Sequence, residues 1–243
     1  MMGLGWDHSA PGWLASMGET GDVTRVHVMD APMLAALPAQ GDVLDIGCGE
    51  GRFCRMMQAR GLRVVGLDPT AALLDAARAR DATGSYIQGG AENLPFEPNS
   101  FDAVVFYLSL IDIPDFRAAI CEAVRVMRPG GRMVIANLTP HVTARPRNWR
   151  GEGNHWVVQG GERQHLAVDD MNRERAITSA WGGIRIENHH RPLSAYMTSL
   201  LDAGLILRQF EDPPCTGPDT DTIDRYTRMP WAFLMVWDKP EET

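Results

Sequence analysis

The sequence has few cysteines and no excess of positive charge, and each shortage narrows the class of protein. Its four cysteines are scattered through 243 residues without a C-x-x-C pair, so neither a disulfide framework nor a cysteine-bound zinc is indicated. The formal net charge is -8 and the isoelectric point is near 5.3. This balance argues against nucleic acid as a partner, because nucleic-acid-binding proteins carry a basic face.

Long apolar runs are missing as well. No stretch approaches the roughly 18 consecutive apolar residues that a membrane helix needs, and neither terminus has the pattern of a signal peptide. The sequence therefore predicts a cytoplasmic protein that is not embedded in a membrane. Hydrophobic residues still make up 44% of the chain, which is ordinary for a globular protein, and we expect a single domain over residues 1–243 with insertions.

A glycine-rich turn stands out at residues 42–51, Asp-Val-Leu-Asp-Ile-Gly-Cys-Gly-Glu-Gly. Its apolar residues are typical of a strand buried on both faces, and helical spacing begins just beyond the glycines. Glycine at such a turn permits a positive φ and a close approach of a ligand to the backbone, and the first N–H groups of the next helix are free to bind polar atoms. We interpret this stretch as a nucleotide-binding strand–turn–helix.

Strands and helices alternate after this turn. Strands are predicted at 43–46, 63–67, 86–88, 101–106 and 133–136, with helices from the glycines to 61, at 70–80 and at 116–128. A helix at 194–203 and strands at 205–210 and 232–237 follow, with a surface loop at 213–218 between the last two strands. Alternation at such short intervals predicts an α/β fold with a parallel sheet covered on both faces.

Two segments interrupt the alternation. Residues 1–40 carry Trp6 and Trp13 ahead of a helix predicted at 22–37, and this N-terminal segment is expected to dock on the body, either as simple core cover or as part of a lid. Residues 141–192 are rich in Arg, Gly, His and Trp. They contain two short predicted strands, at 162–168 and 184–187, and are expected to form a small hairpin cap over the substrate.

Asp68 ends the second predicted strand, 23 positions after Asp45. A carboxylate at this place accepts hydrogen bonds from the ribose hydroxyls of an adenosine that lies across the strand ends. Two kinds of adenosine cofactor fit. The nicotinamide pattern G-x-G-x-x-G/A, counted from Gly47, has its last position at Arg52, whereas the third glycine is Gly51, and this spacing argues against NAD.

Five segments together resemble the class I S-adenosylmethionine-dependent methyltransferases, in particular the group that includes the ubiquinone and menaquinone C-methyltransferases. They are Val-Leu-Asp-Ile-Gly-Cys-Gly-Glu-Gly at 43–51, Val-Gly-Leu-Asp at 65–68, Ala-Glu-Asn-Leu-Pro-Phe at 91–96, Phe-Asp-Ala-Val-Val at 101–105 and Val-Met-Arg-Pro-Gly-Gly at 126–131. The resemblance implies a Rossmann-like, doubly wound seven-stranded sheet whose last strand inserts antiparallel. It also implies S-adenosylmethionine as the cofactor and S-adenosylhomocysteine as the product.

The resemblance also assigns cofactor-binding roles to eight positions. Asp45, Gly47, Gly49 and Gly51 would line the turn and hold the methionine part, Asp68 would hold the ribose, and Pro69, Ala91 and Glu92 would lie beside the adenine. Many relatives have an Asp before the Ala-Glu pair, where this chain has Gly90. A backbone group or Glu92 would have to replace that contact.

Candidates for a catalytic base come from the loop after the fourth strand and from a C-terminal run, Asn-His-His-Arg-Pro-Leu-Ser-Ala-Tyr at 188–196, that is similar to a set of bacterial methyltransferases. Methyl transfer is an in-line displacement in which positioning supplies much of the acceleration, and a base is needed only when the acceptor carries a proton. The candidates are Tyr107, His190 and Tyr196, with His189 and Asp112 beside them. Arg191 is either structural or a ligand for a substrate carboxylate.

The remaining conspicuous residues are histidines and tryptophans. The adjacent pair His189 and His190 has no third ligand at a clear spacing, so no metal is predicted. Four tryptophans are candidates either for the walls of an aromatic pocket or for anchors of the cap: Trp13, Trp149, Trp156 and Trp181. The sequence thus predicts methyl transfer to a small molecule. The alternatives are an NAD-dependent oxidoreductase and a non-catalytic cofactor-binding module of the same fold.

Overall fold

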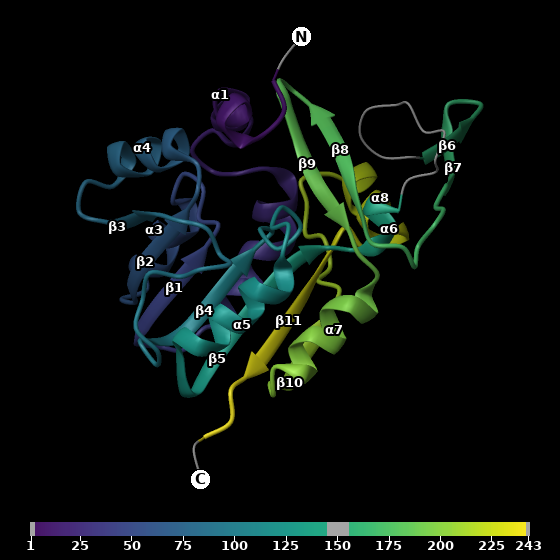
Figure 1. The fold of residues 1–243 in the computed structure, drawn as a ribbon. Helices are drawn as coiled ribbons and strands as arrows, with labels where there is room; N and C mark the ends of the chain where they lie inside the picture. Colours follow the sequence, from purple (N-terminus) through teal and green to yellow (C-terminus); the bar gives the residue numbers. More distant parts are fainter. Residues whose placement is uncertain (1–2, 145–155, 242–243) are drawn as a thin grey trace.

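The structure of the chain is a computed structural model that describes residues 3–144 and 156–241. Its centre is a seven-stranded sheet with the strand order β10-β11-β5-β4-β1-β2-β3 (Figure 1). The strands are β1 (Asp42–Ile46), β2 (Arg63–Asp68), β3 (Ser85–Gln88), β4 (Phe101–Tyr107), β5 (Met127–Leu138), β10 (Ile206–Glu211) and β11 (Ala232–Asp238). Strands β1 to β5 pair in parallel, whereas β11 pairs antiparallel with both β5 and β10. The predicted α/β fold with an antiparallel last strand is confirmed.

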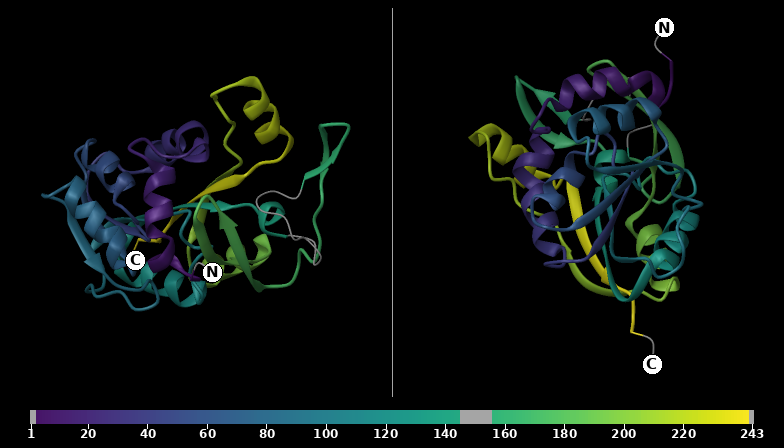
Figure 2. Two further views of the ribbon diagram at one scale, coloured as in Figure 1. Left: turned by 90° about the horizontal axis from the view of Figure 1, so that it is seen from above. Right: turned by 90° about the vertical axis from the view of Figure 1, so that its left-hand side faces the viewer.

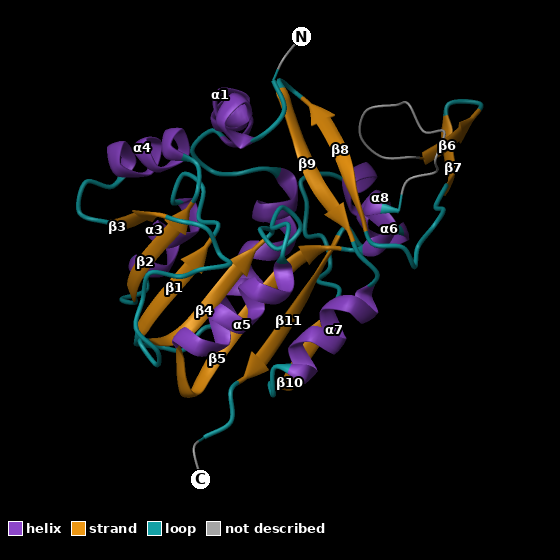
Figure 3. Cartoon of the chain, in the orientation of Figure 1, coloured by secondary structure: helices purple, strands orange, loops and turns teal. Residues whose placement is uncertain are grey.

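Helices cover both faces of the sheet, as Figures 2 and 3 show. One face packs against α5 (Phe116–Val126) and α7 (Leu193–Asp202), through an apolar cluster that includes Phe106, Ile120 and Leu200. The other face packs against α2 (Asp30–Ala36), α3 (Arg52–Gln58) and α4 (Ala71–Arg80). Burial on both faces explains the nearly continuous apolar runs in β4 and β11.

The helix predicted at 22–37 is present with an irregularity. A π-helical turn, Arg25–Met29, leads directly into α2. Pro32 stands in the following turn, and it cannot donate an N–H to the carbonyl four residues before it. A locally widened turn is one way to accommodate such a missing bond. Arg25, at the start of this π-helical turn, lines a pocket beside the glycine turn.

The additions to the sheet gather at the carboxyl ends of β1, β2, β4 and β5. They are α1 (Trp6–Met17), α6 (Pro140–Thr143), the hairpin of β6 (Trp156–Gln159) and β7 (Glu162–Leu166), the hairpin of β8 (Arg175–Trp181) and β9 (Ile184–His190), and α8 (Thr220–Arg228). In Figures 1 and 2, α1 and the β8–β9 hairpin lie side by side at this end of the molecule. Gly5 N–H donates to the carbonyl of Arg185 at 2.9 Å, and Gly12 has no room for a Cβ, which would lie 2.5 Å from the carbonyl oxygen of Gly183.

Three predictions of secondary structure need correction. The two strands predicted in the cap exist, but they belong to separate hairpins instead of pairing with each other. Their partners β6 and β8 were missed: β6 begins at the edge of the described residues, and β8 alternates polar and small residues without a clear apolar face. The helix predicted at 116–128 ends at Val126, and β5 begins at Met127 and runs through the Pro-Gly-Gly segment.

Candidate active site

The glycine turn follows β1 as the sequence predicts, and all three glycines have positive φ. The φ values are 78° at Gly47, 57° at Gly49 and 73° at Gly51, in a region that residues with a Cβ rarely occupy. The N–H groups of Gly47 and Cys48 both donate to the carbonyl of Leu67 at the end of β2, at 2.7 and 3.1 Å. These bonds fix the turn against the next strand.

The three glycines serve different purposes. A Cβ on Gly47 would lie 2.4 Å from Cβ of Ser109, and one on Gly51 would lie 2.7 Å from the ring of Tyr86, so packing requires both. A Cβ on Gly49 would meet only Nε1 of Trp13, at 4.0 Å. Gly47 and Gly49 line the cavity described below, whereas Gly51 is the N-cap of α3 and does not. The position of Gly51 favours a structural role.

Two carboxylates flank the turn. Asp68 accepts hydrogen bonds from the N–H groups of Gly49 and Thr70, at 2.9 and 2.8 Å, and lines the cavity. Burial raises the pKa of Asp68, and these N–H donors act against that shift. Asp45 is 1% exposed, and its Oδ1 has no hydrogen-bond partner while its Oδ2 accepts from Cys54. A buried oxygen without a hydrogen-bond partner destabilises the folded protein, and a bound ligand with an N–H or O–H group could donate the missing hydrogen bond.

The third group of predicted cofactor residues forms the rim. Pro69, Gly90, Ala91 and Glu92 all line the cavity. A carboxyl oxygen of Glu92 lies 3.3 Å from the point that a Cβ on Gly90 would occupy. A carboxyl group of Glu92 therefore lies next to position 90, and its replacing the missing Asp stays a prediction.

A single large cavity joins these elements. Its volume is about 820 Å³, and it extends from Asp68 and the glycine turn to apolar walls at the carboxyl end of the sheet. The walls include Trp6 and Trp13 from α1, Trp181 and Ile186 from the β8–β9 hairpin, and Ile111 from the loop after β4. Of the two roles left open for the N-terminal segment, the structure favours a lid, because both tryptophans of α1 face the cavity.

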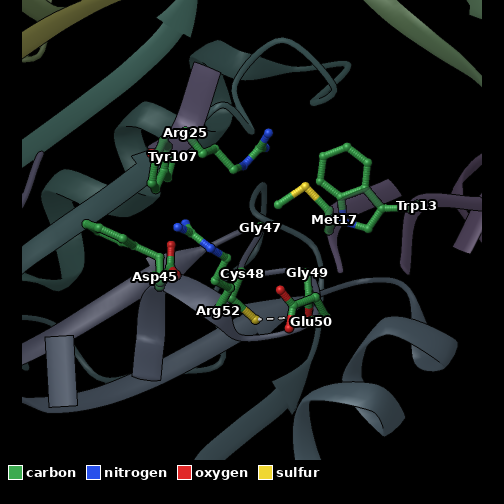
Figure 4. A pocket seen from close by; sticks show the side chains of 11 residues that line it. Trp13, Met17, Arg25, Asp45, Gly47, Cys48, Gly49, Glu50, Arg52 and Tyr107 are labelled. Carbon is green, nitrogen blue, oxygen red and sulfur yellow. Dashed lines mark hydrogen bonds between the residues drawn. The ribbon is translucent and has the colours of Figure 1, made fainter. Parts of the chain in front are cut away.

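A small side pocket of about 60 Å³ opens beside the turn. Figure 4 shows Trp13, Met17 and Arg25 on one side of it, and Asp45, Arg52 and the glycine turn on the other. Arg25 pairs with Asp22 at 2.6 Å, and its guanidinium lies 4.8 Å from the ring centroid of Trp13. Sequence reasoning missed Arg25. Its spacing from Asp22 is that of an ordinary surface ion pair, and nothing in the sequence says that this helix faces the turn.

Tyr107 reaches the cavity, but its hydroxyl is already engaged. The ring lines both pockets, and the hydroxyl donates to Oδ1 of Asp30 at 2.8 Å. Asp30 in turn accepts from Arg52. Burial, followed by the charge of Asp30, raises the pKa of Tyr107. A hydroxyl held in this way is a poor base, and the geometry favours a role in shaping the wall.

The structure does not bring His190 and Tyr196 to the cavity. His190 is fully buried; its Nδ1 shares a hydrogen bond with the hydroxyl of Thr143 at 2.7 Å, and its Nε2 lies 3.0 Å from the carbonyl oxygen of Met171. Burial lowers the pKa of His190. Tyr196 packs between Phe116 and Phe233 in the core. Their positions favour structural roles over the catalytic ones expected from the sequence.

The tryptophan candidates divide. Trp13 and Trp181 line the cavity. Trp156 does not; the guanidinium carbon of Arg228 lies 5.0 Å from the centroid of the Trp156 ring. Trp149 lies outside the described residues. Among residues 3–144 and 156–241, no group of three or more His, Cys, Asp or Glu side chains could hold a metal ion. Within the same ranges, no helix combines the length and apolar character that crossing a membrane requires.

A glycine turn after the first strand, an acidic residue ending the second, and an antiparallel last strand together define the class I methyltransferase type of cofactor-binding fold. Comparison with known proteins agrees. The family model "Methyltransferase domain" matches residues 44–135. The malonyl-[acyl-carrier protein] O-methyltransferase of Salmonella typhimurium is 30% identical over 197 residues, 80% of this chain and 74% of that protein. The chain belongs to the S-adenosylmethionine-dependent methyltransferase family, and S-adenosylmethionine is its cofactor.

Other relatives match a shorter part of the chain. The demethylmenaquinone methyltransferase of Renibacterium salmoninarum is 37% identical over 131 residues, 54% of this chain and 53% of that protein. The chain thus spans about half the length of several curated relatives that it matches. An S-adenosylmethionine-dependent methyltransferase structure from Mesorhizobium loti superposes with a TM-score of 0.76 at 24% identity, over 91% of this chain and all of that one, and supports the fold.

The open position at Gly49 leads to a testable contrast with Gly47. Gly49→Ala should still fold, at a cost of about 1–2 kcal/mol for placing a Cβ at a positive φ, because the new methyl group meets no protein atom closer than 4.0 Å. It should weaken S-adenosylhomocysteine binding by about tenfold or more by entering the cavity. Gly47→Ala should instead lower the melting temperature strongly, since its methyl group would overlap Ser109. Calorimetric titration and thermal melts measure both effects. Equal cofactor affinity in Gly49→Ala and the wild type would contradict the assignment of the turn.

Proposed function

We propose that the protein transfers the methyl group of S-adenosylmethionine to a small molecule. The observation that carries this proposal is the continuous cavity of about 820 Å³ that links the cofactor turn to an apolar chamber. This volume lies toward the upper end of the range for small-molecule sites, about 300–1,000 Å³. One end holds the polar groups that a nucleoside needs, and the other end has room and walls for a second molecule.

The residues of the chain would act mainly by positioning. The bound cofactor supplies an electrophilic methyl group on a sulfonium. Asp68 and the turn fix one side of the reacting pair, while Trp6, Trp181 and Ile186 form apolar walls that exclude water from the other. Holding two reactants in line in a closed site supplies a large part of the rate acceleration for a displacement.

Part of the chamber wall lies outside the segment that the family model covers. The matched segment ends at residue 135, whereas Trp6, Trp181 and Trp231 on the chamber wall lie outside it. Relatives of this chain are named for different acceptors, a demethylmenaquinone and a malonyl-[acyl-carrier protein]. The relatives therefore support the reaction class, and the chamber decides what enters.

Two measurements test the proposal. Titration calorimetry with S-adenosylmethionine and S-adenosylhomocysteine should show binding, and a nicotinamide fluorescence titration should show none; the reverse result would favour the oxidoreductase alternative. Transfer of a radiolabelled methyl group from S-adenosylmethionine to a filtered metabolite extract should then yield a labelled small molecule. Cofactor binding without any transfer would support a non-catalytic module and overturn the proposal.

A further inference from the structure

Asp112 lies on the acceptor side of the cavity and is not assigned by the family pattern. It stands in the loop between β4 and α5, where its backbone N–H donates to the carbonyl of Ser109 at 2.9 Å. The residue is half-buried, and it lines the cavity. Ile111 and Ile113, its neighbours in the chain, line the same cavity. Asp112 is therefore a carboxyl group set in an apolar wall.

The C-terminal run that begins at Asn188 holds this loop in place. The side-chain amide of Asn188 donates to Oδ1 of Asp112, and the backbone N–H of His189 donates to the carbonyl of Ile111 at 2.8 Å. Arg191, 3% exposed, donates to three backbone carbonyls of the loop, those of Leu110 at 2.9 Å, Ile113 at 2.6 Å and Pro114 at 3.0 Å. The run thus contacts the loop on both sides of Asp112.

Trp6 and several charged side chains lie around Asp112. Trp6, on α1, lines the same cavity as Asp112. Burial raises the pKa of Asp112 to about 7; the nearby carboxylate of Asp68 raises it further, while Asn188, Arg25 and Trp6 act in the opposite direction. Asp22 also lines the cavity and pairs with Arg25. A carboxyl group with a pKa near the working pH is well matched to accepting a proton.

Resting on the methyltransferase function proposed above, we propose that Asp112 is the general base that removes the proton of an O–H or N–H methyl acceptor, and that Asn188 and Arg191 are positioning residues that hold it. In this step the acceptor atom forms its bond to the methyl carbon and gives its proton to the carboxylate of Asp112. The bond between the methyl carbon and sulfur breaks, and its electron pair stays on sulfur.

This arrangement selects among acceptor classes. A carboxylate acceptor arrives without a proton to remove, and it would enter a cavity that already contains Asp68 and Asp112. Among the described residues that line this cavity, the cation is Arg25, which is already paired with Asp22 at 2.6 Å. A neutral molecule with an apolar or aromatic skeleton and one hydroxyl or amine avoids this repulsion and suits the tryptophan walls.

The acceptor class is tested with three probes that share one skeleton: 2-naphthol, 2-naphthylamine and 2-naphthoic acid, each assayed with radiolabelled S-adenosylmethionine beside the metabolite extract. We expect labelled products from hydroxyl or amine compounds only. A carboxylate ester as the main product would overturn the inference while leaving the proposed function intact. An absence of transfer to every probe and to the extract would overturn the proposed function, and the inference with it.

The base is tested with variants, on whichever compound accepts the label. Asp112→Asn should lower kcat by about 10²- to 10⁴-fold with unchanged S-adenosylhomocysteine affinity, and the wild-type rate should fall below about pH 7, following the pKa of Asp112. Asn188→Ala removes a donor to the carboxylate, so the acid limb of the pH profile should move upward, and the change should vanish in an Asp112→Asn background. Glu187→Gln, an exposed carboxyl on the same strand, is the matched control and should change nothing. An Asp112→Asn variant that binds cofactor and keeps its kcat, or an Asn188→Ala variant with an unmoved profile, would overturn the assignment.

Discussion

Asp68→Ala should weaken the binding of S-adenosylmethionine and S-adenosylhomocysteine by about 10- to 150-fold, which corresponds to about 1.5–3 kcal/mol, the range for a lost hydrogen bond to a charged group. The carboxyl group of Asp68 lines the cavity, and its two oxygens already accept from the N–H groups of Gly49 and Thr70. Each oxygen retains acceptor capacity for a ligand hydroxyl. Titration calorimetry at fixed salt measures the change.

Two further variants separate ligand contact from turn geometry. Asp68→Asn keeps the shape and one acceptor oxygen, so it should lose less affinity than Asp68→Ala. Asp75→Ala, on the exposed face of α4 with a side chain 76% exposed, should bind the cofactor as the wild type does. If Asp68→Ala retained full affinity in a folded protein, Asp68 would be removed from the cofactor site.

Much of the sheet could be predicted because its strands are buried on both faces. The apolar runs of β1, β4 and β11 leave few other interpretations, and the glycines mark the turn by their spacing. The additions were harder. In α8 the only buried residue is Thr222, and in β8 only Ser179, so neither element carries an apolar stripe that would reveal it. Their positions depend on the body they pack against.

The cofactor half of the site could also be predicted from the sequence, because a local turn and the end of one strand supply most of its residues. Asp45, Gly47, Gly49 and Asp68 come together because β1 and β2 are adjacent parallel strands. The acceptor half combines segments that are distant in the chain. Asp112 and Asn188 are 76 positions apart, and their contact follows from the place of the β8–β9 hairpin over the loop after β4. No local pattern encodes that contact. The burial of His190 likewise depends on residues distant in the chain, Thr143 and Met171, so the sequence could not show that His190 lies away from the cavity.

Asp45 should give the apoprotein a pH-dependent loss of stability that Asp45→Asn removes. Burial, opposed by the hydrogen bond from Cys54 and assisted by the charge of Asp68, raises the pKa of Asp45 to about 7. In the unfolded chain this carboxyl group titrates near its ordinary pKa, about 3.9. Between these values the native state holds one proton more than the unfolded state. The free energy of unfolding therefore falls by about 1.4 kcal/mol per pH unit as pH rises toward 7, and this contribution is constant above that pH.

The comparison that isolates this effect is the difference in unfolding free energy between Asp45→Asn and the wild type, measured by urea denaturation without cofactor at pH 5, 6, 7 and 8. The difference should grow in favour of Asp45→Asn by about 2–3 kcal/mol from pH 5 to pH 7 and then level off. The exposed variant Asp75→Asn should show no such trend. A difference that stays flat across this range would mean that the native state does not hold the proton. In that case the unpaired Oδ1 would be an ionised oxygen, and its desolvation would have to be offset by contacts other than those seen around Cys54.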